Sequence, residues 1–244
     1  MAKTLLMLGA KSDIGLAIAH EFAAQGFDLI LAAREATSLD ASKADIEVRY
    51  QNAVEIVNFD VLDYASHGAF YETLPCKPDV VASVIGYLGE QDKAQCEFEH
   101  ARKIIDTNYT GLVSILSCVA EDMAIRKSGA LIAVSSVAGD RGRPSNYCYG
   151  SAKGGLSLFL EGLAARMSKF DVKVLDVKPG FVATRMTEKL DLPRVLVVEP
   201  KIIAKDVYKA YFKGKNVVYT PWFWTYIMLI IRNIPRVIFN RLKL

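Results

Sequence analysis

The chain has 244 residues, of which 52% are hydrophobic, which is enough apolar material for the core of one large α/β domain. Its formal net charge of +3, from 30 basic and 27 acidic side chains, offers no general surface for nucleic acid. Four widely spaced cysteines follow no secretory signal, and three scattered histidines lack the spacing of zinc ligands. We therefore expect a cytoplasmic protein with free thiols and no metal site.

The elements predicted in chain order alternate between strands and helices. Apolar runs predict six strands, at 4–10, 27–33, 53–59, 79–85, 130–136 and 172–177. Helical periodicity predicts helices at 13–26, 62–74, within 93–126, and at 149–168. Continuously apolar strands separated by helices indicate a doubly wound α/β fold with a parallel sheet covered on both faces. Ligands of such folds bind beyond the carboxyl ends of the strands, so we looked for functional residues there.

The stretch LGAKSDIG follows the first strand and opens the first helix. Its backbone N–H groups and the positive helix end are suited to a pyrophosphate, although two glycines after a strand are equally typical of a tight turn. Asp13 stands where a third glycine is usual, and a carboxylate is unfavourable beside phosphate. The candidate cofactor-binding residues of this loop are Gly9, Lys11, Ser12, Asp13, Ile14 and Gly15.

The second strand ends in Ala33 and Arg34 rather than in the acidic residue that binds the ribose hydroxyl of NAD. Arg34, assisted by Lys11, could pair with a 2′-phosphate, so NADP is preferred over NAD; a solvated surface arginine is the alternative. At the end of the third strand, Asp60 and Val61 are expected at the adenine, or Asp60 caps the following helix.

Tyr149 and Lys153 lie four positions apart in YCYGSAKGGL, at the predicted start of a helix, so they share one helical face. An ammonium group beside a phenol lowers the pKa of the phenol, and the pair could serve as an acid and base. A polar helix start with a solvated lysine is the alternative. Ser136, thirteen residues before Tyr149, ends the fifth strand, and the intervening loop can return both to one crevice.

Together with Asn108 in DTNYTG and the stretch KPGFVAT, these motifs resemble the signature of the short-chain dehydrogenase/reductase superfamily. The resemblance implies a single-domain Rossmann fold over residues 1–220. It also implies that Tyr149 donates a proton to a substrate carbonyl, Ser136 binds the carbonyl oxygen, and Lys153 lowers the pKa of Tyr149 and binds the nicotinamide ribose. Asn108 would bend its helix and hold a water of the proton relay.

The same resemblance places further residues at the nicotinamide end of NADPH. They are Gly86, which leaves room for the cofactor, and Pro179, Gly180, Val182 and Thr184. It implies an oxidoreductase that interconverts a ketone and a secondary alcohol, assembled as a homodimer or homotetramer. A non-catalytic NADP-binding scaffold is a distant alternative, because the serine, tyrosine and lysine are all in place.

Within the superfamily, the stretches at 86–91, 135–156 and 220–239 are similar to those of reductases that act on decaprenylphosphoryl-2-keto-erythro-pentose. This resemblance implies a lipid-linked keto-sugar as the substrate. An acyl or other small hydrophobic ketone is the alternative.

The tail at 221–244 combines an apolar run at 222–231 with four basic residues and no acidic one. The run is too short to span a bilayer, which needs about 20 residues, but the mixture is typical of contact with an anionic membrane surface. We therefore expect a pocket cover or a peripheral contact with the inner face of a membrane.

Overall fold

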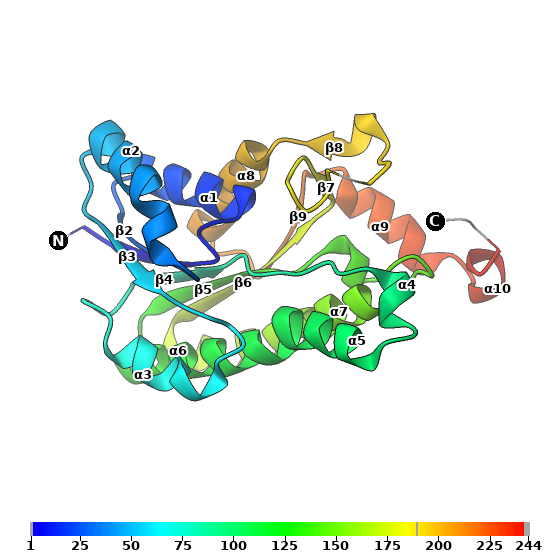
Figure 1. The fold of residues 1–244 in the computed structure, drawn as a ribbon, viewed down its shortest axis with the longest axis horizontal. Helices are drawn as coiled ribbons and strands as arrows, with labels where there is room; N and C mark the ends of the chain where they lie inside the picture. The colour runs from blue at the N-terminus through cyan, green and yellow to red at the C-terminus, as the bar shows by residue number, and fades with distance from the viewer. Residues whose placement is uncertain (1, 189, 242–244) are drawn as a thin grey trace.

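In the computed structural model, which describes residues 2–188 and 190–241, a seven-stranded parallel sheet runs through the centre of the molecule (Figure 1). The strand order is β3-β2-β1-β4-β5-β6-β9, and every neighbouring pair is parallel. Its strands are β1 (Thr4–Leu8), β2 (Asp28–Ala33), β3 (Val54–Asn58), β4 (Val80–Ser83), β5 (Gly129–Val134), β6 (Val172–Pro179) and β9 (Val217–Thr220). The order reverses between β1 and β4, which is where folds of this kind open their ligand crevice.

Helices cover both faces of the sheet (Figure 1). One face carries α1 (Asp13–Ala24), α2 (Asp40–Tyr50) and α8 (Pro200–Phe212). The other carries α3 (His67–Glu72), α5 (Phe98–Ile105), α6 (Gly111–Arg126) and α7 (Tyr147–Met167). The remaining elements are the short α4 (Gln91–Ala94), the tail helices α9 (Trp224–Asn233) and α10 (Arg236–Phe239), and a two-stranded pair of β7 (Phe181–Val182) and β8 (Val197–Val198).

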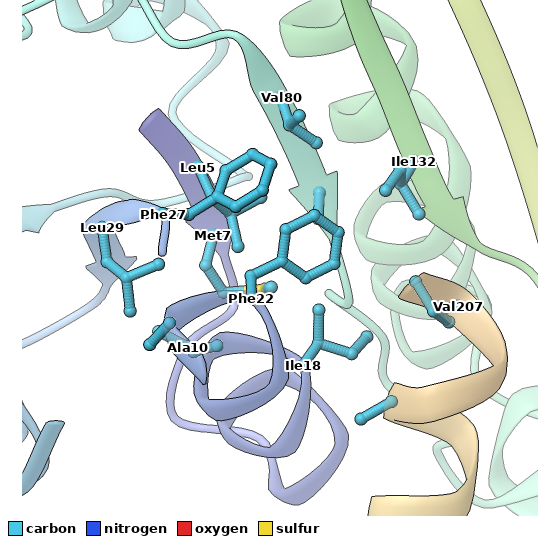
Figure 2. Packing of buried hydrophobic residues seen from close by; sticks show 14 of the residues in the cluster. Leu5, Met7, Ala10, Ile18, Phe22, Phe27, Leu29, Val80, Ile132 and Val207 are labelled. Atoms are coloured by element: carbon cyan, nitrogen blue, oxygen red, sulfur yellow. The ribbon is translucent and has the colours of Figure 1, made fainter. Parts of the chain in front are cut away.

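Alternate residues of each strand enter opposite cores, because successive side chains of a strand point to opposite faces. Leu5 and Met7 pack with Phe22 of α1 and Val207 of α8 (Figure 2). Leu6 and its neighbours on the same face pack instead against α6 and α7. Burial on both faces explains why these strands are apolar without interruption.

The sequence prediction of a doubly wound α/β fold is confirmed, but several elements were missed, among them α2, α8 and β9. The helix α2 buries only Ile46, so its sequence carries little apolar periodicity. The helix α8 and the four-residue strand β9 lie between the KPGFVAT stretch and the tail, in a segment for which no element was predicted. The predicted helix at 62–74 is a 3-10 turn followed by the six-residue α3, and the segment 93–126 is divided into several helices.

The tail packs against the domain along one side of α9. Trp224 is 2% exposed and Met228 is fully buried, and both share a hydrophobic cluster with Val137, which directly follows Ser136. Within the described ranges, 2–188 and 190–241, no helix combines the length and the apolar content that crossing a bilayer requires.

Candidate active site

Ser136 and Tyr149 meet at the carboxyl ends of the strands. Ser136 follows β5 and caps a 3-10 turn, where its hydroxyl accepts from the backbone N–H of Ala138 at 3.1 Å. Tyr149 lies in the first turn of α7, and its phenol is close enough to the Ser136 hydroxyl for that group to lower the pKa of the phenol. The loop between them therefore returns both side chains to one place.

Lys153 lies one turn further along α7 and is almost fully buried. Its Nζ donates to the carbonyl oxygen of Val134 at 2.9 Å and to that of Ile85 at 3.3 Å, and lies 5.9 Å from the centre of the Tyr149 ring. Gly86 lies beside Lys153: a Cβ added to Gly86 would be 3.4 Å from the Lys153 Nζ. The ammonium is thus held between β4 and β5, behind the phenol.

The expected lowering of the Tyr149 pKa is wrong for this structure. Burial raises the pKa of Tyr149 to about 12, and the hydrogen bond from Ser136 opposes that shift. Burial also lowers the pKa of Lys153 to about 8, against the attraction of Asp176. The reason is that desolvation disfavours both charged forms, while the ammonium is bound to backbone carbonyls rather than to the phenol oxygen. Tyr149 is therefore held as a protonated acid.

Asn108 is fully buried in a π-helical turn, Asp106–Thr110, between α5 and α6. Its side-chain Nδ2 donates to the carbonyls of Ile104 at 2.8 Å and Tyr87 at 2.6 Å, and its Oδ1 accepts from the Tyr87 N–H at 3.2 Å. The Asn108 side chain donates to the carbonyl oxygen of Ile104, four residues earlier. In a regular α-helix the backbone N–H of residue 108 would donate to this oxygen instead. Asn108 thereby fixes the segment after β4, including Gly86, against the helix.

A buried polar network that sequence reasoning missed lies behind the lysine. The Asp176 carboxylate accepts from the Ser135 hydroxyl at 2.5 Å and lies 3.7 Å from the Lys178 ammonium, which itself lies 2.6 Å from Asp140. Burial raises the pKa of Asp176. The sequence held a signal, since Asp176 and Lys178 are charged residues at alternate positions in the second half of a largely apolar strand.

The glycine loop forms a cradle whose shape requires its two glycines. Gly9 has a φ of +87°, and a Cβ at Gly15 would lie 2.6 Å from the Gly9 carbonyl oxygen. Ser12 caps α1, accepting from the Gly15 N–H at 3.0 Å and donating to the Gly9 carbonyl at 2.9 Å, while Ile14 packs partly buried on the core below. These residues fit a pyrophosphate on the helix N-terminus.

Beside this cradle lies a cavity of about 580 Å³. Of the candidate residues it is lined by Gly9, Lys11, Ser12, Arg34, Asp60, Val61 and Gly86. Residues that sequence reasoning missed also line it: Glu35, Phe59, Tyr87, Lys103 and Thr107. The structure places the first set at the ends of β1 to β4, so the cavity has the position and size for a dinucleotide.

Charged residues around this cavity have partners within the chain. The Lys11 ammonium lies 3.4 Å from the Glu35 carboxylate, and both side chains are exposed. The Asp60 carboxylate accepts from the Leu62 N–H at 3.0 Å, which closes a turn, and the following 3-10 helix, Tyr64–Ser66, has Asp63 rather than Asp60 at its N-cap.

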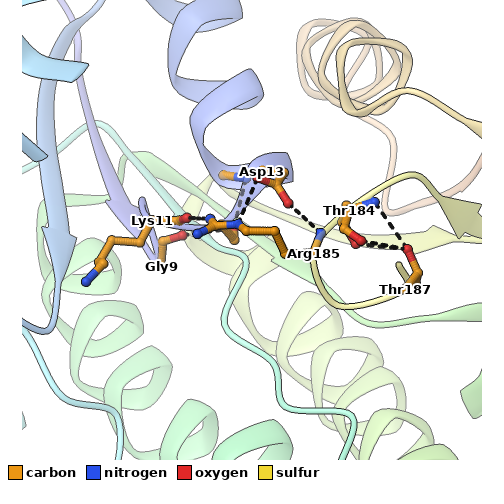
Figure 3. A network of polar contacts seen from close by, with 8 residues as sticks. Gly9, Lys11, Asp13, Thr184, Arg185 and Thr187 are labelled. Atoms are coloured by element: carbon orange, nitrogen blue, oxygen red, sulfur yellow. Dashed lines mark hydrogen bonds and ion pairs between the residues drawn. The ribbon is translucent and has the colours of Figure 1, made fainter. Parts of the chain in front are cut away.

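Asp13 has a partner that the sequence did not indicate (Figure 3). Its carboxylate accepts from the Arg185 backbone N–H at 2.9 Å and from Arg185 Nε at 3.2 Å, and the same guanidinium donates to the Lys11 carbonyl. The carboxylate expected beside phosphate thus faces the loop at 184–187 and lines a second cavity, of about 590 Å³, with Thr184. Arg185 joins this loop to the glycine loop.

The remaining candidates continue from β6 into that loop. Pro179 ends β6, and the Gly180 N–H donates to the Thr220 carbonyl at 3.0 Å. Val182 is buried in β7, and its carbonyl accepts from the Thr187 hydroxyl at 2.5 Å, which fixes the turn around Thr184. The structure therefore brings the motif residues from four separated stretches of sequence to one edge of the sheet.

Comparison with known proteins agrees with this geometry. Residues 3–194 match the family model of the short-chain dehydrogenases. An uncharacterised oxidoreductase of Mycobacterium tuberculosis is 36% identical over 244 residues, covering 99% of this chain and 97% of that protein. A 3-oxoacyl-[acyl-carrier-protein] reductase of Synechocystis is 30% identical, covering 88% and 94%.

Solved structures show the same fold. A short-chain dehydrogenase from Sphingobium yanoikuyae in complex with NADPH superposes with a TM-score of 0.82 at 23% identity, covering 96% of this chain and 97% of that one. A 3-oxoacyl-[acyl-carrier protein] reductase from Brucella melitensis in complex with NAD gives 0.83 at 23% identity, covering 93% and 98%. The chain therefore belongs to the short-chain dehydrogenase family of oxidoreductases.

Proposed function

We propose that this protein reduces a ketone to a secondary alcohol with NADPH. The observation that carries the proposal is the convergence of Ser136 and a protonated Tyr149 at the ends of the strands, with the buried Lys153 behind them. When bound, the nicotinamide supplies a hydride to the carbonyl carbon. Negative charge that develops on the carbonyl oxygen is then stabilised by two hydroxyl donors, and Tyr149 transfers its proton to that oxygen.

The proton-transfer proposal is tested by removing one oxygen atom. We expect Tyr149→Phe to keep NADPH affinity within about twofold and to lose at least about 100-fold in turnover, the range that general acid catalysis contributes. Tyr50→Phe makes the same chemical change at the end of α2, outside the lining of the dinucleotide cavity, and should keep full turnover. Turnover retained by Tyr149→Phe would refute the assignment.

We further propose that Arg34 and Lys11 select NADPH over NADH. Both line the dinucleotide cavity where β2 and β1 end, and an exposed pair such as Lys11 with Glu35 contributes little free energy, so Lys11 can change partner. Arg34→Met should weaken NADPH binding about tenfold with NADH binding unchanged. Glu35→Gln should strengthen NADPH binding by removing the competing carboxylate. An unchanged ratio of the two dissociation constants in Arg34→Met would contradict the proposal.

For the substrate, we propose a polyprenyl-phosphate-linked keto-sugar. The stretches at 86–91, 135–156 and 220–239 support it by their resemblance to the corresponding reductases. The tail lies beside the site, because the buried tail residues Trp224 and Met228 share a hydrophobic cluster with Val137, next to Ser136. The second candidate is an acyl ketone, which the identity to the Synechocystis reductase favours.

NADPH consumption separates these substrates. Three compounds should be compared: a prenyl-phosphate-linked 2-keto-pentose, the same keto-pentose without its prenyl phosphate, and an acetoacetyl thioester. The first proposal predicts the highest kcat/KM for the prenyl-linked sugar. Preference for the thioester would establish the second candidate instead.

We propose that the outer side of α9 touches an anionic membrane surface. Trp222, Tyr226 and Ile230 are 70%, 61% and 66% exposed, whereas the inner side of the helix is buried. Arg232 and Arg236 follow, and residues 222–241 contain no acidic side chain. A second copy of this surface would bring like charges together, whereas anionic lipid is complementary to it.

Vesicle flotation tests this contact. Tyr226→Ser with Ile230→Ser should reduce binding to phosphatidylglycerol-containing vesicles at least tenfold, since each buried apolar side chain contributes about 2 kcal/mol. The matched control is Val48→Ser with Phe212→Ser, which removes two exposed apolar side chains from α2 and α8. Equal flotation of both variants would exclude the contact, and a change in oligomeric state alone would indicate that a second copy covers α9.

We also propose a homodimer or homotetramer assembled through α6 and α7. Ile125 and Leu158 on these helices are 83% and 70% exposed, which supports an apolar contact. Leu158→Arg should shift the mass measured by light scattering toward the monomer. An unchanged mass would exclude α7 from the interface.

A further inference from the structure

A buried polar network contacts the chain on both sides of Ser136. Directly before Ser136, the Ser135 hydroxyl donates to the Asp176 carboxylate. After Ser136, a 3-10 turn ends at Asp140, whose carboxylate lies 2.6 Å from the Lys178 ammonium. Lys178 also lies 3.7 Å from Asp176, so one ammonium group joins the two carboxylates. The network therefore binds the residues that come before and after the serine of the site.

Asp140 is the member of this network that belongs to the loop between Ser136 and Tyr149. Its Oδ1 accepts from Lys178 Nζ at 2.6 Å, and its Oδ2 accepts from the Tyr219 hydroxyl at 2.6 Å. The Lys178 and Asp140 side chains are only 11% and 5% exposed. A buried ion pair contributes little net free energy compared with an apolar pair, but it requires both groups at fixed positions. We therefore expect its main effect to be on the geometry of the loop.

Backbone hydrogen bonds connect the position of Asp140 to that of Ser136. The Gly139 N–H donates to the Ser136 carbonyl at 3.0 Å, and the Asp140 N–H donates to the Val137 carbonyl at 3.2 Å, which closes the turn. The Ser136 hydroxyl accepts from the Ala138 N–H of the same turn at 3.1 Å. A displacement of the turn therefore displaces the Ser136 hydroxyl as well.

The same turn lies directly against α7, where glycines allow close contact. A Cβ at Gly139 would lie 2.6 Å from the Gly154 backbone nitrogen, and a Cβ at Gly154 would lie 2.8 Å from the Gly139 carbonyl oxygen. A Cβ at Gly150 would lie 2.9 Å from another carbonyl oxygen of the turn. Gly150 and Gly154 directly follow the tyrosine and the lysine of the site. The contact between turn and helix therefore sets the distance from Ser136 to those two side chains.

We infer that Asp140 is a positioning residue of this active site, which holds the Ser136 turn against α7 through its bonds to Lys178 and Tyr219. The inference rests on the proposed reductase function and adds to it a residue that acts through Ser136 rather than by contact with the substrate. Ser136 stabilises charge on the carbonyl oxygen only at the correct distance, and a shift of about 1 Å can cost about 100-fold in rate.

A double-mutant cycle on kcat tests this role. Asp140→Asn removes the charge of the carboxylate, while Lys178 keeps Asp176 as a counterion. The substrate is the prenyl-linked 2-keto-pentose, the free 2-keto-pentose or the acetoacetyl thioester, whichever the wild type reduces fastest. With saturating NADPH, we expect Asp140→Asn to lower kcat about 10- to 100-fold and Ser136→Ala to lower it about 100- to 1000-fold. The double variant should lie within about threefold of Ser136→Ala, because a misplaced Ser136 has already lost its effect.

The affinity for NADPH separates this role from a general loss of structure. The network residues lie outside the lining of the dinucleotide cavity, so the dissociation constant of NADPH should change less than about twofold in Asp140→Asn.

Asp122→Asn is the chemically matched control. The Asp122 carboxylate lies 2.8 Å from Arg126 Nε and accepts from the Tyr71 hydroxyl at 2.8 Å, so it also combines an ion pair with a hydrogen bond from tyrosine. It lies on α6, outside the network around Ser136. Its kcat should equal that of the wild type, whatever its unfolding temperature.

Amide hydrogen exchange reports on the turn without using turnover. In Asp140→Asn the peptide containing residues 136–140 should exchange about tenfold faster, the factor for loss of one hydrogen bond to a charged group. In Asp122→Asn the same peptide should exchange at the wild-type rate. Tyr219→Phe removes only the second partner of Asp140, so kcat and exchange should change in the same direction by about two- to tenfold. This variant carries the test if Asp140→Asn does not fold.

Unchanged kcat or unchanged exchange in Asp140→Asn would overturn the inference. Losses in kcat that multiply in the double variant would also overturn it, because they would show that Asp140 does not act through Ser136. Equal losses of kcat in Asp140→Asn and Asp122→Asn would make Asp140 a stabilising residue without a role in positioning. Failure of the reductase proposal is separate, because it is judged by Tyr149→Phe turnover and leaves the exchange result unaffected.

Discussion

Gly180 is predicted to be irreplaceable because of a tail residue 44 positions away. A Cβ at Gly180 would lie 1.8 Å from Trp224 Nε1 and 1.9 Å from Cε2, so Gly180→Ala cannot keep the indole in place. The backbone is not the obstacle, since the φ of Gly180 lies outside the left-handed range. We therefore expect the alanine to expel Trp224 from its cluster with Val137 and Met228.

The size of the effect follows from the burial of the indole. Trp224 is 2% exposed and contacts Phe181 edge to face with ring centres 5.1 Å apart. An aromatic side chain buries about 150–250 Å², or about 4–6 kcal/mol as an upper estimate, and deleting a buried tryptophan costs about 3–5 kcal/mol. Gly180→Ala should therefore lower the free energy of unfolding by about 3 kcal/mol.

Urea denaturation of four proteins gives the test: wild type, Gly180→Ala, Trp224→Ala and the double variant. In the Trp224→Ala background the added methyl group meets no indole, so the second change should cost less than about 0.5 kcal/mol. Fluorescence reports the displacement directly, because Trp222→Phe leaves Trp224 as the only tryptophan, whose emission should shift to the red in Gly180→Ala. Additive losses in the double variant would refute the steric reasoning.

Three further predictions concern stability. Asn108→Ala should lower the free energy of unfolding by about 2–4 kcal/mol in urea, because three hydrogen bonds of a buried amide are lost; a loss below 1 kcal/mol would show that the π-helical turn does not depend on it. Arg185→Met should lower the free energy of unfolding by less than about 1 kcal/mol in urea, since the ion pair of Arg185 with Asp13 is exposed. A larger loss would show that this ion pair stabilises the glycine loop. The wild type should gain stability relative to Lys153→Met as the pH rises from 8 to about 10.5. The pKa of Lys153 is lowered to about 8 in the folded state, so the unfolded chain binds more protons than the folded one over that interval. A constant difference in stability between the two proteins across the interval would contradict the lowered pKa.

The strands and the motif residues were predictable because their signals are local. Six apolar runs identify strands that are buried on both faces, and a glycine or serine at the end of such a run marks the crevice. The helix α2 was not predictable in the same way, since it buries only one side chain. Its position follows from the chain connection between β2 and β3, which it joins.

Spacing within one helix also predicted that Tyr149 and Lys153 share a face, but it could not predict their proton affinities. Those depend on how far each group is removed from water and on which carbonyls surround it, and the carbonyls of Ile85 and Val134 come from the segment after β4 and from β5. The sequence alone suggested a proton donor of lowered pKa, whereas burial raises the pKa of Tyr149.

By itself, the sequence determined the fold class and the types of side chain at the crevice, since apolar periodicity and the order of the motifs depend on residues that are close together in the chain. Tertiary structure decided the contacts between distant stretches, such as Arg185 on Asp13 and Trp224 against Gly180. The physical reason is that such contacts join residues dozens of positions apart, whose proximity depends on how the whole sheet is ordered and covered.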